Sequence, residues 1–367
     1  MQLSDSRIVM TLDAGGTNLK FSAIRAGELL FDPIYIPTEA DNLDRCLGNI
    51  VEGFSQVRTR CPAAPVAISF AFPGPADYPA GIIGDLPNLP AFRGGIALGP
   101  MLEEKFGIPV YINNDGDLFV YGEAIAGFLP HVNKLLEEAG SPKRYKNLFG
   151  VTLGTGFGGG IVRDGELFIG DNSVGGEAWL LRNKLNPAVN AEEGASIRAV
   201  RRVYADIAGI PFDQTPEPKV ICDIAAGQAP GRKDAAVEAF RRLGDVAGDA
   251  IAQALTLTDG LAVIGGGIAA AAPLFLPSLV AALNDVYHKP TGPQRRLIAQ
   301  AFNFDDAVER AAFLDGEVRT ITVPGSTKTI QYDPLQRTAV GLTRLGTSEA
   351  VAVGAYAYAI RKLDARR

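Results

Sequence analysis

The chain of 367 residues contains little cysteine and histidine. Its three cysteines, Cys46, Cys61 and Cys222, are widely spaced and form no Cys-x-x-Cys pair, which argues against a disulfide framework and a cysteine zinc site. The two histidines, His131 and His288, lie outside any motif, so a histidine base is not expected. A reducing cytoplasm is the expected compartment for such a chain.

The chain also lacks an excess of basic residues, with 35 lysines and arginines against 41 aspartates and glutamates. This balance provides no electrostatic surface for nucleic acid, and the first 25 residues contain no apolar secretory segment after a basic start. The overall composition is that of a globular protein, with 47% hydrophobic and 21% charged residues. The length favours two domains, each with its own core.

One long stretch contains no charge: residues 260–284, "GLAVIGGGIAAAAPLFLPSLVAALN". Its length would suffice to span a bilayer. The three consecutive glycines and two prolines instead predict a buried strand "LAVIG", a glycine turn and a separate helix. We therefore expect no membrane partner.

Two segments combine a strand pattern with glycines: "MTLDAGGTNLKF" from residue 10 and "VTLGTGFGGGIV" from residue 151. Each is expected to open an antiparallel meander, with "GELLFDPIYIPT" as a third strand in the first. "RAGEL" follows the first segment and "RDGEL" the second, which indicates an internal duplication. We expect two α/β domains with both glycine turns at one cleft, and a third turn at "VIGGGIAA".

Such turns expose backbone N–H groups that suit phosphate oxygens, and Thr17 and Thr155 add hydroxyl donors. Two turns at one cleft indicate a polyphosphate ligand. Asp13 would repel a phosphate unless a cation lies between them, so it predicts Mg²⁺ held through water.

Several motifs in one order resemble the ROK family of sugar kinases, within the actin-like hexokinase superfamily: "LDAGGTNLK", "NNDGDLFVYGEA", "GVTLGTGFGGGIV", "GGEAW" and "VIGGGIAA". The resemblance implies two duplicated actin-like (ribonuclease H-like) α/β domains, residues 1–119 and 120–347, around a central cleft. It implies that a C-terminal helix, about 348–367, packs back on the first domain. Residues around 300–340, including "GEVRTITVPGSTKTIQYDP", are expected to form a β insertion.

The implied activity is phosphorylation of a hexose or hexose derivative by ATP and Mg²⁺, and a homodimer would fit the family. The matching catalytic base is Asp115, and the matching sugar ligands are Asn88, Asn114, Glu177 and Glu192, with Glu193 as an alternative to Glu192. The matching ATP-binding residues are Asp13, Gly15, Gly16, Thr17 and Lys20 in the first turn, Gly154, Thr155 and Gly156 in the second, and Gly265, Gly266 and Gly267 in the third.

The chain departs from the family between its two predicted sugar-binding glutamates. Many members have a zinc site there, but "EAWLLRNKLNPAVNAEE" contains no cysteine or histidine, so zinc is not expected. Trp179-Leu180 stands in place of the family's Gly-His. Trp179 either stacks on a sugar or packs in the core.

Three other functions are compatible with parts of the sequence. "GTGFGGG" satisfies the dinucleotide fingerprint, but a hairpin pattern rather than a helix follows it, which disfavours an NAD-dependent oxidoreductase. A sugar-sensing repressor of the same family would need a DNA-binding segment, for which about seven residues before the first strand leave no room. A relative that binds a sugar or nucleotide without turnover stays open because the family's histidine is missing.

Overall fold

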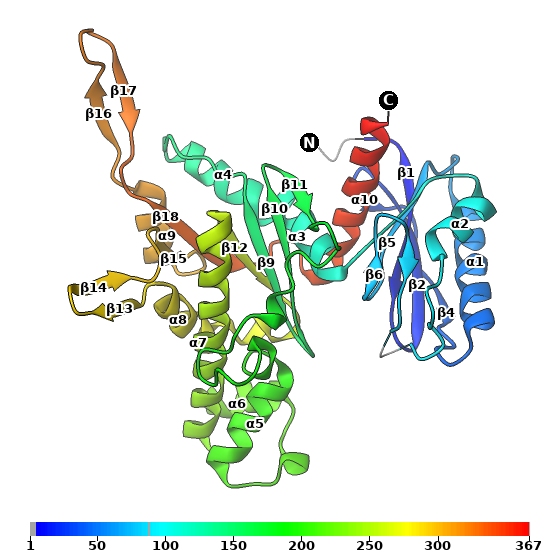
Figure 1. Ribbon diagram of the computed structural model, residues 1–367, viewed down its shortest axis with the longest axis horizontal. Coiled ribbons are helices and arrows are strands. Elements are labelled where there is room, and N and C mark those ends of the chain that lie inside the picture. The colour runs from blue at the N-terminus through cyan, green and yellow to red at the C-terminus, as the bar shows by residue number, and fades with distance from the viewer. Residues whose placement is uncertain (1–4, 87–88, 367) are drawn as a thin grey trace. The chain divides into compact units, whose positions relative to one another are not determined.

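The computed structural model describes residues 5–86 and 89–366. It shows a chain of helices and strands that divides into two compact units (Figure 1). Unit 1 comprises Met1–Gly127, Leu167–Gly175 and Leu345–Arg367, and unit 2 comprises Phe128–Glu166 and Gly176–Arg344.

The sheet of unit 1 has the order β3-β2-β1-β5-β8, with β4 also paired to β2. Its strands are β1 (Ile8–Ala14), β2 (Asn18–Arg25), β3 (Glu28–Leu29), β4 (Ile34–Pro37), β5 (Ala67–Ala71) and β8 (Val110–Asn113). β1 is antiparallel to β2 and parallel to β5, which is parallel to β8. The prediction of one third strand was wrong, because Pro33 cannot donate a ladder hydrogen bond and separates β3 from β4.

Four helices complete unit 1: α1 (Leu43–Arg60), α2 (Leu98–Phe106), α3 (Asp115–Ile125) and α10 (Thr347–Ala365); a short ribbon is formed by β6 (Ala76–Asp77) and β7 (Ile82–Ile83). Helices α3 and α10 approach each other through glycines. A Cβ atom on Gly122 would lie 2.0 Å from the Ala350 carbonyl oxygen, and one on Gly354 would lie 2.0 Å from that of Leu118. This close packing fixes α3, which begins at Asp115.

The sheet of unit 2 has the order β11-β10-β9-β12-β18-β15, and only the last two residues of β11 are assigned to unit 1. Its strands are β9 (Leu148–Leu153), β10 (Phe157–Arg163), β11 (Glu166–Phe168), β12 (Leu261–Gly265), β15 (Gln300–Asn303) and β18 (Arg337–Leu342). β9 is antiparallel to β10 and parallel to β12, and β18 is parallel to both β12 and β15. Along the chain, each sheet thus starts with an antiparallel pair joined by a glycine turn and later gains parallel strands, which confirms the predicted α/β class.

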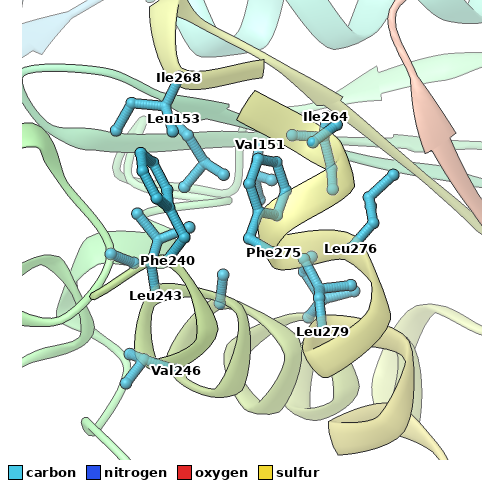
Figure 2. Packing of buried hydrophobic residues seen from close by; sticks show 14 of the residues in the cluster. Val151, Leu153, Phe240, Leu243, Val246, Ile264, Ile268, Phe275, Leu276 and Leu279 are labelled. Atoms are coloured by element: carbon cyan, nitrogen blue, oxygen red, sulfur yellow. The ribbon is translucent and has the colours of Figure 1, made fainter. Parts of the chain in front are cut away.

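The helices of unit 2 are α4 (Phe128–Glu138), α5 (Ile197–Ala208), α6 (Pro218–Ala225), α7 (Lys233–Thr258), α8 (Ala272–Leu283) and α9 (Ala307–Asp315), and its 3₁₀ turns are η1 (Ala178–Leu180), η2 (Ala191–Glu193), η3 (Phe212–Gln214) and η4 (Gly267–Ala271). Figure 2 shows Phe240 of α7 and Phe275 of α8 beside Val151 and Ile264 of the sheet, all buried. Burial of such side chains stabilises the unit by about 1.5–3 kcal/mol each.

The uncharged stretch folds as predicted, as strand β12, the turn η4 and helix α8. Among the residues that the structure describes, no helix is long and apolar enough to cross a membrane.

The region expected to contain a β insertion divides into two kinds of structure. Strands β16 (Arg319–Thr322) and β17 (Thr329–Tyr332) pair as the expected hairpin, which is exposed and extends beyond the sheet of unit 2 (Figure 1). A second hairpin, β13 (Val286–Lys289) with β14 (Gly292–Arg295), precedes it. β15 and β18, in contrast, belong to the main sheet, because their buried apolar residues extend the core.

Candidate functional site

The first glycine turn joins β1 to β2 and is held by backbone hydrogen bonds. The Gly15 N–H donates to the Asn18 carbonyl at 3.1 Å, and the Thr38 hydroxyl donates to the Gly15 carbonyl at 2.6 Å. A Cβ atom on Gly15 would lie 2.8 Å from that Asn18 oxygen, so the turn requires glycine there. Gly16 and Thr17 are exposed, which leaves this stretch of backbone accessible to a ligand.

Asp115 lies where β8 gives way to α3. The helix is capped by Asn114, whose side-chain oxygen accepts from the Gly116 N–H at 2.8 Å. Capping is therefore a role of Asn114, and the same residue also reaches the Tyr78 hydroxyl at 3.5 Å. Asp115 keeps an exposed surface, but desolvation by the protein around its carboxyl raises the pKa of this group above its ordinary value. The negative charge of Asp13 raises it further, against hydrogen bonds from backbone N–H groups.

A cavity of about 630 Å³ in unit 1 brings three of the predicted residues together. Asp13, Lys20 and Asp115 all line it, and Asp13 lies opposite Lys20 in the register of β1 and β2. Two carboxylates and an ammonium group can bind a hydrated divalent cation beside a phosphate.

The same cavity contains residues that the sequence reasoning missed. Thr11 and Ser22 line it as a directly opposed pair of β1 and β2, and Thr347 and Ser348 line it from the first turn of α10. Alternation along β1 places Thr11 on the same face as Asp13, so this residue could have been found from the sequence. The C-terminal helix was expected to pack on the first domain, but nothing in its sequence indicated that Thr347 and Ser348 line this cavity.

The second glycine turn, in unit 2, joins β9 to β10. The Gly154 N–H donates to the Gly156 carbonyl at 3.0 Å, and the Ile197 N–H donates to the Gly154 carbonyl at 2.8 Å. The Glu192 carboxylate accepts from the Phe157 N–H at 3.1 Å. A Cβ atom on Gly156 would lie 2.7 Å from that carboxylate, so the structure places a predicted sugar ligand directly against a predicted phosphate turn.

The structure distinguishes Glu192 from its neighbour. Glu193 forms ion pairs with Arg198 and Arg202, which lower the pKa of its carboxyl. Glu192 forms a longer ion pair with Arg198, at 3.5 Å through Oε1, and its Oε2 accepts from the turn. Of the two alternatives, Glu192 is the residue at the turn.

Glu177 immediately precedes η1, and its carboxylate accepts a hydrogen bond from the indole N–H of Trp179. Trp179 is 36% exposed and lies outside the clusters of buried apolar residues. The core-packing alternative for Trp179 is therefore wrong.

Backbone and amide hydrogen bonds hold the loop that connects Glu177 to Glu192. The buried Asn183 side chain accepts from the N–H groups of Leu185 at 2.9 Å and Asn186 at 3.1 Å. In the part of the chain that the structure describes, no group of three or more histidine, cysteine, aspartate or glutamate residues could hold a metal ion.

The third glycine turn follows β12 and packs against the second. Gly266 has φ of 90°, and a Cβ atom there would lie 2.2 Å from the carbonyl oxygen of Leu153, the residue before Gly154. Gly266 is therefore required both by its backbone conformation and by this close approach. Gly265 ends the buried strand, whereas Gly267 has open space around it.

The predicted residues thus form two groups, one in each unit. Asp13, Lys20 and Asp115 share the cavity of unit 1, while Glu192 and the second and third turns are adjacent in unit 2. Asn88, the remaining predicted sugar ligand, lies outside the described residues.

Comparison with known proteins gives concordant matches. The ROK family matches residues 9–314. The solved structure of a glucokinase from Parabacteroides distasonis is 53% identical, covers 98% of this chain and 99% of its own, and superposes with a TM-score of 0.92. An N-acetyl-D-glucosamine kinase from Vibrio parahaemolyticus is 28% identical over 274 residues, which are 70% of this chain and 83% of that protein. The ROK hexokinase of Thermus thermophilus, 19% identical with a TM-score of 0.65 over 95% of this chain and 96% of its own, shares the fold.

Proposed function

The chain belongs to the ROK family, and we propose that it transfers the γ-phosphoryl group of ATP to a hydroxyl of a hexose or hexose derivative. The family match and the full-length likeness to a glucokinase make it an ATP-dependent sugar kinase with an actin-like fold. The observation that carries the proposed chemistry is the cavity of unit 1, where Asp115 lies with Asp13 and Lys20.

In the proposed mechanism, Asp115 accepts the proton of the attacking sugar hydroxyl. Its raised pKa makes the carboxylate a stronger base than an aspartate with an ordinary pKa, which favours proton transfer as the hydroxyl attacks. The substrate hydroxyl proposed is the primary 6-hydroxyl.

The residues of the first turn suit the triphosphate. We assign phosphate contacts to the exposed backbone at Gly16 and Thr17 and to Lys20, and we assign Asp13 to the waters of Mg²⁺. The carboxylates of Asp13 and Asp115, which both line this cavity, fit such a cation, which when bound would neutralise charge on the phosphates.

Unit 2 supplies the remaining proposed contacts. We assign the turn from Gly154 to Gly156 to phosphate, and Gly265 to Gly267 to the adenosine side. We assign Glu177 and Glu192 to sugar hydroxyls, together with Asn114 of unit 1. The hydrogen bond from the Phe157 N–H to the Glu192 carboxylate supports this assignment, because it holds the carboxylate beside the second glycine turn.

The test is an ADP-release screen with glucose, fructose, mannose, N-acetylglucosamine and N-acetylmannosamine, run beside the variant Asp115→Asn. We expect sugar-dependent ADP release from the natural chain and a kcat about 10³-fold lower in the variant, since general-base catalysis contributes about 10²–10⁴-fold. Asp41→Asn, at an exposed position of unit 1 without a hydrogen bond or ion pair to any described residue, is the matched control.

Two results would contradict the proposal. Turnover by Asp115→Asn close to that of the natural chain would remove the assigned base. Absence of ADP release with every sugar, despite sugar binding, would favour the alternative of a binding relative without turnover.

A further inference from the structure

Trp179 is the sole tryptophan of the chain. Its indole N–H, the one polar group of the side chain, donates a hydrogen bond to a carboxylate. The acceptor is Oε2 of Glu177, two residues earlier, at the start of the 3₁₀ turn η1. A hydrogen bond to an ionised acceptor is stronger than one between neutral groups.

The surroundings of the pair resemble those of a binding surface more than those of a core. Trp179 is 36% exposed, and Glu177 is half-buried. Between them, Ala178 is buried in the core of unit 2 and anchors the turn. A Cβ atom on Gly159 of β10 would lie 2.9 Å from the Ala178 side chain, so the turn is seated tightly on the sheet.

The segment that follows is equally fixed. The Ala191 N–H donates to the Leu181 carbonyl at 2.6 Å, and Asn183 holds the loop between them through two hydrogen bonds from backbone N–H groups. Trp179 therefore projects from a turn that is anchored on both sides.

We infer that Trp179 is a positioning residue for sugar recognition: its indole N–H occupies Oε2 of Glu177, so that Oε1 is presented to a sugar hydroxyl beside the indole ring. This rests on the proposed function, which assigns Glu177 to the sugar. A glutamate on a partly exposed turn otherwise samples several rotamers, and fixing one of them removes an entropic cost from binding.

The kinetic test compares Trp179→Phe with Leu180→Ala. Phenylalanine keeps an aromatic ring but removes the N–H donor, whereas Leu180 is 58% exposed on the same turn and serves as the control. With glucose and N-acetylglucosamine as probes, we expect Trp179→Phe to raise the sugar KM about tenfold, equivalent to about 1.4 kcal/mol. kcat and the KM for ATP should stay unchanged, and Leu180→Ala should resemble the natural chain.

Fluorescence gives a readout that does not depend on turnover, because all tryptophan emission comes from Trp179. We expect glucose or N-acetylglucosamine to change this emission in the natural chain. In Glu177→Gln the same change should require at least tenfold more sugar.

The outcomes separate this inference from the proposed function. An unchanged sugar KM in Trp179→Phe, together with sugar-dependent ADP release, would overturn the inference and leave the kinase function standing. An equal rise in the KM for sugar and for ATP, with a lower Tm, would overturn it in favour of a merely structural role. A sugar-dependent emission change without any ADP release would support the inference while contradicting the proposed turnover.

Discussion

The first glycine turn, between β1 and β2, has a carboxylate in its own strand, whereas the second, between β9 and β10, receives one from a distant segment. In the first hairpin Ala14 pairs with Leu19, and Asp13 directly precedes Ala14. In the second, Leu153 pairs with Phe157, whose N–H donates to Glu192, 35 residues further along the chain. The two hairpins thus have carboxylates that come from different parts of the chain.

The difference extends to what each carboxylate does. Asp13 is exposed and lines the cavity of unit 1, and its carboxylate makes no hydrogen bond or ion pair with any residue that the structure describes. Glu192 is bound to the backbone of its turn. An exposed carboxylate of the first kind can direct its charge to a hydrated cation, while one of the second kind ties a loop to a turn. We therefore expect the two turns to respond differently to substitution.

Among the variants that compare the two turns, the largest expected effect comes from removing the charge at the first turn. Asp13→Asn should lower kcat by about 10²-fold, the magnitude typical of losing one charge-stabilising group in an active site. Steady-state ADP release measured over a range of Mg²⁺ concentrations checks this.

Glu192→Gln is the matched comparison at the second turn. Its amide oxygen can still accept from the Phe157 N–H, so we expect a kcat within a few-fold of the natural value and a raised KM for the sugar. Equal losses of kcat in the two variants would mean that the carboxylates have the same role.

An intermediate effect is expected from a pair of glycine substitutions. Gly156→Ala would place a methyl group 2.7 Å from the Glu192 carboxylate and force it away from the Phe157 N–H. We expect the free energy of unfolding of unit 2 to fall by about 1–2 kcal/mol, because a buried donor loses its acceptor. Urea unfolding measures the change.

Gly16→Ala is the counterpart in the first turn, since no atom lies within 4 Å of the added Cβ. Its stability should stay unchanged, while the KM for ATP rises if the exposed backbone contacts phosphate. A destabilised Gly16→Ala beside an unaffected Gly156→Ala would contradict the described difference between the turns.

The smallest expected effect concerns pH. The pKa of Asp115 is raised by desolvation and by the charge of Asp13, and a general base acts in its deprotonated form. Activity should therefore fall as the pH falls through this raised pKa. Asp13→Asn removes one cause of the rise, so the midpoint should move to lower pH in a ¹³C NMR titration of the Asp115 carboxyl in the ligand-free chain. Glu192→Gln is the control, and a midpoint that moves upward in Asp13→Asn would contradict the assignment.

The sequence was informative where a candidate residue lies at the end of a strand, next to the turn or helix that follows it. Asp13 and Asp115 stand at strand ends, and the structure places both in one cavity. The bond between Glu192 and Phe157 depends on tertiary packing between β10 and η2, which local patterns do not encode. The break between β3 and β4 was readable from Pro33, because proline lacks the N–H that a continuous strand needs.

The position of α10 in the chain has a consequence for biosynthesis. This helix packs on β1, β5 and α3, and the Tyr356 hydroxyl donates to the Asp5 carbonyl at 2.8 Å, yet it is translated after all of unit 2. During synthesis the N-terminal segment therefore lacks one of the helices that cover it. Its apolar surface around Val9 and Tyr111 stays exposed until α10 leaves the ribosome. All residues of unit 2 are synthesised before α10. Unit 2 should therefore complete its folding before unit 1, although synthesis of unit 1 begins first.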